Sequence, residues 1–108
     1  MTTQLSQLLE KIASLQRQLN DKRFLQLRLY RRDSRVYQLS SAVNHTIACW
    51  LSENYRPVAI LIERGRSFMH EFPAGSPEAV GYYALAEEFF EVVLSALEVI
   101  PKCGACDD

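Results

Sequence analysis

Apolar side chains recur at spacings of three and four along most of this chain, which is the period of an amphipathic helix. The first segment carries a heptad stripe with polar residues between its members, formed by Leu5, Leu8, Ile12, Leu15 and Leu19. The stripe is interrupted at Lys22 and Gln26 before it resumes at Leu29, so fewer than four heptads are continuous. We therefore expect a long N-terminal helix that forms the arm of a helical hairpin or a short dimer seam.

A second and a third helix are predicted by the same spacing. The pair Asp33-Ser34 suits a helix N-terminus, and Pro57 suits the first turn of a helix. The second helix has the apolar positions Val36, Leu39, Val43, Ile47, Trp50 and Leu51. The third, over 57–72, has the apolar positions Val58, Leu61, Ile62, Gly65, Phe68, Met69 and Phe72. We expect the two phenylalanines and the methionine of this third face to fill the core.

The last helix is predicted after the loop at 73–77, the strongest loop signal in the chain. Ser76 is its expected cap, Pro77 its first residue, and Pro101 its stop. Its main apolar positions are Val80, Tyr83, Ala84, Phe90, Val93, Leu94, Leu97 and Ile100.

A second apolar face lies beside the main one on this last helix. Tyr82 and Phe89 are seven residues apart, so both lie on that second face. A helix that is apolar over more than half of its circumference is either central in its bundle or covered by a second chain, and we expect the second chain. The predicted interface of an oligomer, most simply a dimer, consists of Leu5, Leu8, Ile12, Leu15, Leu19, Tyr82 and Phe89.

The whole pattern predicts an all-α domain over 1–100, a helical hairpin or a four-helix bundle, followed by a short tail at 101–108. The alternative is an α+β fold with two short hairpins, because residues 25–29 alternate with the period of a strand and 58–62 are largely β-branched. A length of 108 residues suits one domain and is too short for two. With no leader-like N-terminus and no apolar run near the ~20 residues of a membrane span, we expect a cytoplasmic protein without membrane contact.

The three cysteines do not suit a closed set of disulfides. Cys49 lies in an apolar helical stretch and is expected in the core. Cys103 and Cys106 form a C-x-x-C pair, which is only half of a tetrahedral zinc site, and no second pair or later histidine completes it. We expect a reduced tail with no metal and no cofactor, and a metal or redox role of this pair is the alternative.

Charge is divided unevenly between the two parts of the sequence. Residues 1–40 carry a net charge of +5 and residues 41–108 a net charge of −6. Segment 22–35 holds six cations and one anion, so it can bind an acidic protein surface or phosphates. The residues predicted to bind a partner are Lys22, Arg23, Arg28, Arg31, Arg32 and Arg35. The alternative is internal pairing of this segment with the acidic side chains of the last helix, Glu87, Glu88, Glu91 and Glu98.

Arg64 and His70 stand six positions apart, a spacing that resembles the Arg-x4–6-His pattern of HEPN-type helical ribonucleases. The resemblance implies a fold of helices in which His70 acts as a base and Arg64 stabilises the charge on the phosphate. The alternative is that the charged residues here form surface pairs on one helix, Glu63 with Arg66 or Arg64 with Glu71. The common phosphate-binding, zinc-binding and nucleophile motifs do not occur in the sequence.

These observations predict a small non-enzymatic interaction or adaptor protein of the inhibitor, regulator or chaperone type. It is expected to self-associate and to bind a macromolecular partner. The first alternative is a nucleic-acid-binding regulator that uses segment 22–35, and the remote alternative is a HEPN-like ribonuclease.

Overall fold

The helical period is realised in the computed structural model, which describes residues 2–24 and 34–100. Four long helices are present: α1 (Thr2–Leu19), α3 (Ser34–Leu51), α4 (Val58–Glu71) and α5 (Pro77–Val99). Residues 22–24 are also helical, and the described residues contain no strand. The all-α prediction is confirmed, and the strand alternative for 58–62 is wrong because α4 covers these residues. The other proposed strand, 25–29, and the predicted tail, 101–108, lie outside the described residues.

The helix ends follow from the residues that occupy them. Ser76 caps α5, because its hydroxyl accepts a hydrogen bond from the backbone N–H of Ala79 at 3.1 Å, and Pro77 is the first helical residue. Pro57 directly precedes α4, and α3 begins at Ser34. These starts agree with the boundaries predicted from the sequence.

The N-terminal helix is shorter than the sequence pattern suggests. Beyond Leu19 the backbone tightens, with the N–H of Asn20 bonded to the carbonyl of Arg17 at 3.1 Å. The side chain of Asp21 then accepts a hydrogen bond from the backbone N–H of Arg23 at 3.1 Å, in the manner of a helix cap. The heptad stripe of α1 therefore ends before it reaches Lys22.

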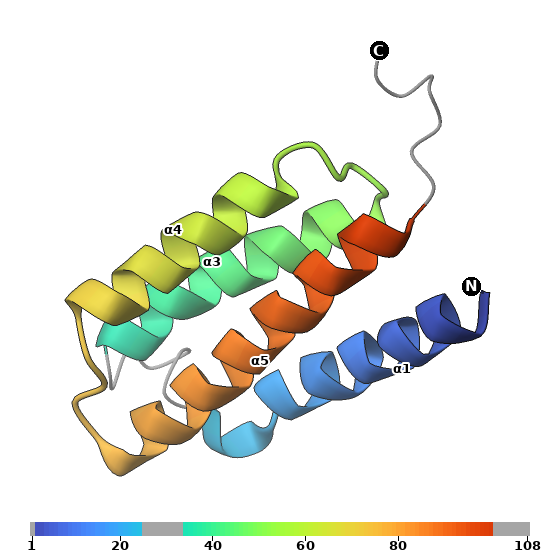
Figure 1. The fold of residues 1–108 in the computed structure, drawn as a ribbon. Helices are drawn as coiled ribbons and strands as arrows, with labels where there is room; N and C mark the ends of the chain where they lie inside the picture. Colours follow the sequence, from blue (N-terminus) through green and yellow to red (C-terminus); the bar gives the residue numbers. More distant parts are fainter. Residues whose placement is uncertain (1, 25–33, 101–108) are drawn as a thin grey trace.

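The helix α5 occupies the centre of the fold (Figure 1). α1 packs antiparallel along one side of it, and the antiparallel pair of α3 and α4 packs along the other. α5 contacts all three of the other helices. Two sides of α5 must therefore be apolar, which explains the broad apolar surface seen in its sequence.

The prediction that a second chain covers this excess face is wrong for its two key residues. Tyr82 and Phe89 are fully buried within the single chain. The ring of Phe24, which follows α1, meets the ring of Tyr82 edge-on with their centroids 5.3 Å apart. α5 is thus the central helix of its own bundle. This is the other of the two explanations that the sequence allowed for its broad apolar surface.

The predicted dimer seam of α1 also lies inside the chain. Ile12, Leu15 and Leu19 are at most 2% exposed, and Leu5 and Leu8 are half-buried against the same core. The reason is the antiparallel pairing of α1 with α5, which turns the heptad stripe inward. These five residues belong to the core of the fold, and the prediction of an interface between chains is corrected accordingly.

The core face of α4 lies toward its N-terminal end. Its buried members are Val58, Leu61, Ile62 and Gly65. Phe68 and Met69 are half-buried and pack against the core at its edge. Phe72 is 41% exposed, so the expectation that it fills the core is wrong. Phe72 already lies past the last residue of α4, where the chain turns away toward α5.

Gly65 marks the closest approach of α4 to α5. A Cβ atom added at this glycine would lie 2.7 Å from two ring atoms of Phe90 and 3.8 Å from the Cβ of Ala42 in α3. Phe90 is fully buried, so its ring has little room to withdraw. The lack of a side chain at Gly65 therefore lets three helices meet at this point.

Gly65→Ala is expected to lower the free energy of unfolding by about 1–3 kcal/mol, because the Phe90 ring must move within a filled core. The matched control is Gly81→Ala in α5, where the added Cβ would meet the ring of Phe24 at 3.6 Å, an ordinary contact. Alanine is favoured over glycine inside a helix by about 1 kcal/mol, so the control should be neutral or stabilising. Urea unfolding measures both, and equal stability of the two variants would contradict this packing.

Candidate functional site

We call residues 22–35 the basic segment, and the structure describes only its two ends, residues 22–24 and 34–35. Lys22 and Arg23 are exposed after α1. The guanidinium of Arg23 lies over the ring of Phe24, 4.6 Å from its centroid, and its Nε is 3.7 Å from a carboxylate oxygen of Asp21. Arg23 therefore covers the aromatic ring that anchors this end of the segment to α5. The predicted partner-binding residues Arg28, Arg31 and Arg32 lie outside the described residues.

Arg35 has a role within the fold. Its Nη1 donates a hydrogen bond to the backbone carbonyl of Pro73 at 2.8 Å, joining the start of α3 to the loop before α5. The hydroxyl of Tyr83 donates to the neighbouring carbonyl of Phe72 at 2.8 Å. These two bonds fix the loop between α4 and α5. We therefore assign Arg35 a structural role, although its side chain is exposed.

The acidic side chains of α5 pair with α1 and α4. Glu88 lies 3.2 Å from the Nζ of Lys11 in α1. Glu87 and Glu91 lie 2.9 and 3.5 Å from the same nitrogen of Arg66 in α4. In the described part of the chain, these three carboxylates thus have cationic partners other than segment 22–35.

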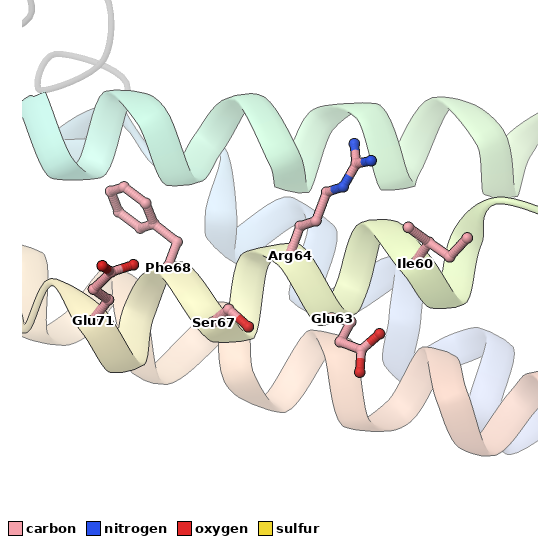
Figure 2. A pocket seen from close by; sticks show the side chains of 6 residues that line it. All are labelled: Ile60, Glu63, Arg64, Ser67, Phe68 and Glu71. Atoms are coloured by element: carbon pink, nitrogen blue, oxygen red, sulfur yellow. The ribbon is translucent and has the colours of Figure 1, made fainter.

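Two open hollows lie on the outward face of α4. The first, about 500 Å³ in volume, is lined by Ile60, Glu63, Arg64, Ser67, Phe68 and Glu71 (Figure 2). The second, about 610 Å³, is lined by Glu63, Arg66, Ser67, His70, Glu71 and Glu87. Figure 2 shows Arg64 and Phe68 extending toward α3 and Glu63 extending toward α5. Both hollows mix carboxylates with an arginine and open to solvent, so neither has a lining of a single charge sign.

Arg64 and His70 do not meet in one hollow. Six residues of an α-helix place their side chains about 120° apart around the axis. Arg64 accordingly lines the first hollow, and His70 lines the second with Glu63 and Ser67. His70 is exposed on the polar face of α4.

The neutral stripe of α3 is a feature that the sequence analysis missed. Residues 36–52 contain no Asp, Glu, Lys or Arg, although 23% of the chain is charged. The exposed side of this stretch carries Tyr37, Ser41, Asn44, Ala48 and Leu51, a set that we call the neutral stripe. Their spacings of four, three, four and three residues keep them on one face of the helix. The absence of charge across nearly the whole of α3 is the signal that could have identified it.

Among residues 2–24 and 34–100, no group of three or more His, Cys, Asp or Glu side chains is arranged to hold a metal ion. Cys49 is buried, as predicted, and Cys103 and Cys106 lie outside the described residues. None of the helices in these ranges is sufficiently long and apolar to cross a membrane.

Comparisons with protein families, with curated proteins and with solved structures found no significant match.

The Arg66 pairs lead to a stability prediction. Arg66→Met is expected to lower the free energy of unfolding by about 1 kcal/mol, because it removes the 2.9 Å charge-assisted hydrogen bond between α4 and α5. The effect should shrink in 1 M NaCl, since salt screens partly exposed charges. The control is Arg64→Met on the outward face of the same helix, which should be close to neutral. An equal cost for the two variants would contradict a specific contribution of Arg66.

Proposed function

We propose that this chain is a small non-enzymatic interaction protein that self-associates and binds an anionic macromolecular partner through its basic segment, residues 22–35. An acidic protein surface is the preferred partner, and the protein acts as an adaptor, inhibitor, regulator or chaperone. The proposal places it in the cytoplasm, where cysteines remain reduced.

The observation that supports the proposal is the pairing of the acidic side chains on α5. The alternative was that these carboxylates neutralise the basic segment within the chain. Among the described residues, Glu88 pairs with Lys11, and Glu87 and Glu91 pair with Arg66. Segment 22–35 holds six cations and one anion. Its excess positive charge is therefore suited to steering and binding an anionic partner.

A nucleic-acid-binding regulator is the second candidate function, because a cluster of arginines neutralises phosphates as readily as carboxylates. The two candidates differ in their dependence on salt. Binding to duplex DNA should weaken with a slope of about −0.9 in log K against log salt for each phosphate that is neutralised.

The first functional prediction concerns the three central arginines. Replacing Arg28, Arg31 and Arg32 together with Glu should weaken partner binding by at least 10-fold, since it reverses the charge of the segment. The measurement is quantitative affinity capture from cells of the native host, followed by titration of the captured partner against the purified variants. A 20-bp DNA duplex titrated in parallel tests the nucleic-acid alternative.

The matched control reverses three exposed arginines elsewhere, Arg17, Arg56 and Arg64, and so changes the net charge by the same amount. It should bind nearly as well as the wild type. Equal loss in both triple variants would show that only net charge matters and would contradict a docking role for the segment. Circular dichroism of both variants verifies that helicity is retained.

The second functional prediction concerns catalysis. Because the protein is proposed to be non-enzymatic, it should not cleave RNA, and His70→Ala should change stability by less than about 0.5 kcal/mol. Cleavage by the wild type that disappears in both His70→Ala and Arg64→Ala would establish the ribonuclease alternative instead. Cleavage that survives both substitutions would indicate contamination.

A further inference from the structure

Arg35 belongs both to the basic segment and to the fold. It is the second residue of α3, which begins at the end of the bundle where α4 ends and α5 starts (Figure 1). Its Nη1 donates a hydrogen bond of 2.8 Å to the backbone carbonyl of Pro73, a bond that we call the loop contact. The side chain is exposed, so an anionic partner of the basic segment can reach the same guanidinium.

The loop contact is weak compared with the pair that an anionic partner offers. Pro73 presents a neutral carbonyl, whereas a carboxylate is charged and can accept two parallel hydrogen bonds from one guanidinium. The first turn of α3 does not hold Arg35 in place, because the N-terminal end of a helix carries partial positive charge that disfavours a cation. A carboxylate that reaches Arg35 therefore competes successfully with Pro73 for its N–H groups.

We propose that the loop contact holds Arg35 back from an anionic partner and is broken when that partner binds. The inference rests on the function proposed above and adds a regulatory step to the same basic segment. Coupling between two contacts of one group is reciprocal, so the loop lowers the affinity for the partner and the bound partner releases the loop. Arg35 in this way links partner binding to the connection between α4 and α5.

The change on release is confined to the middle of the loop. Before Pro73, the carbonyl of Phe72 accepts a hydrogen bond of 2.8 Å from the hydroxyl of Tyr83. After it, Ser76 caps α5 through the bond of 3.1 Å from the N–H of Ala79. Neither bond involves Arg35, so both helix ends stay fixed while residues 73–75 gain freedom. Partner binding is therefore expected to alter a short surface loop and to leave the bundle intact.

Gly75 offers a way to break the loop contact without changing a charge. A Cβ atom added at this exposed glycine would lie 3.1 Å from Nη1 of Arg35. Apart from the chain neighbours of Gly75, no other atom of the described residues lies within 4 Å of that position. The φ of Gly75 is not positive, so a larger residue meets no backbone strain. Gly75→Val should therefore push the guanidinium away from Pro73 and leave the core unchanged.

Fluorescence anisotropy of a labelled decaglutamate peptide, titrated with the full chain at about 50 mM NaCl to limit screening, tests the proposal. Gly75→Val should lower the Kd by about 2- to 5-fold, because an exposed contact holds Arg35 only weakly and its loss removes the competition. Arg35→Gln should raise the Kd, since one cation of the segment is lost. The control is the double variant with both substitutions. It should bind like Arg35→Gln alone, because no guanidinium is left to release.

The outcomes separate this inference from the proposed function. A peptide that does not bind the wild type, or that binds equally well after Arg28, Arg31 and Arg32 are replaced with Glu, contradicts the function and the inference with it. Binding that needs these three arginines but is unchanged by Gly75→Val leaves the function standing and overturns the competition. Weaker binding by Gly75→Val also overturns it, because the loop would then hold Arg35 ready for the partner. Tighter binding that persists in the double variant overturns it as well, because the effect would not depend on Arg35.

The carbonyl carbon resonance of Pro73 tests the release in the wild type, without any substitution in the loop. Its chemical shift depends on whether the carbonyl accepts a hydrogen bond. Saturating peptide should move it in the same direction as Arg35→Gln does without peptide. The reference is the carbonyl of Phe72, which is bonded to Tyr83 and should keep its shift. A Pro73 resonance that stays at its original position when the peptide is bound overturns the proposed release.

Discussion

The ring of Phe90 lies against the backbone of Gly65, and this contact sets how closely the pair of α3 and α4 can approach α5. The added-atom distance of 2.7 Å leaves no space for even one methyl group. Ala42 of α3 borders the same point, so the three helices share one small-residue junction. The partly exposed ion pairs of Arg66 with Glu87 and Glu91 lie between α4 and α5, the two helices that approach closely at this junction. Packing at Gly65 sets the positions of the helices, and the ion pairs bridge helices that are already close.

Much of the fold could be predicted because the helix boundaries depend on residues that are close in the sequence. The start of α5 depends on the Ser76 cap, and the starts of α4 and α5 suit the missing N–H of Pro57 and Pro77. These effects act within one turn and can be read from neighbouring residues. The helical period decided the class for α4, where a short β-branched run alone favoured a strand. The prediction was least accurate where apolar residues needed a partner, because periodicity shows which face is buried and is silent on what buries it.

That difference explains the error over Tyr82 and Phe89. Both were recognised as a second apolar face, but a neighbouring helix of the same chain and a second chain satisfy such a face equally well. The candidate sites show the same difference between what a local pattern reveals and what only the tertiary structure reveals. Arg35 was found as a cation, while its bond to Pro73 joins residues 38 positions apart and has no local signature. The neutral stripe has no cluster of charges to indicate it, and its signal in the sequence is a helix almost without charged residues.

The central position of α5 has a consequence for how the chain folds during synthesis. α1, α3 and α4 all precede α5 in the sequence, yet each of them packs against it. The antiparallel pair of α3 and α4 can form early from neighbouring segments. The stripe of α1 must wait with its leucines uncovered until α5 leaves the ribosome. At about 5–20 residues per second, the 23 residues of α5 alone take roughly one to five seconds to be made. During that interval the leucines of α1 have no helix to cover them, and transiently exposed apolar surface of this kind favours aggregation.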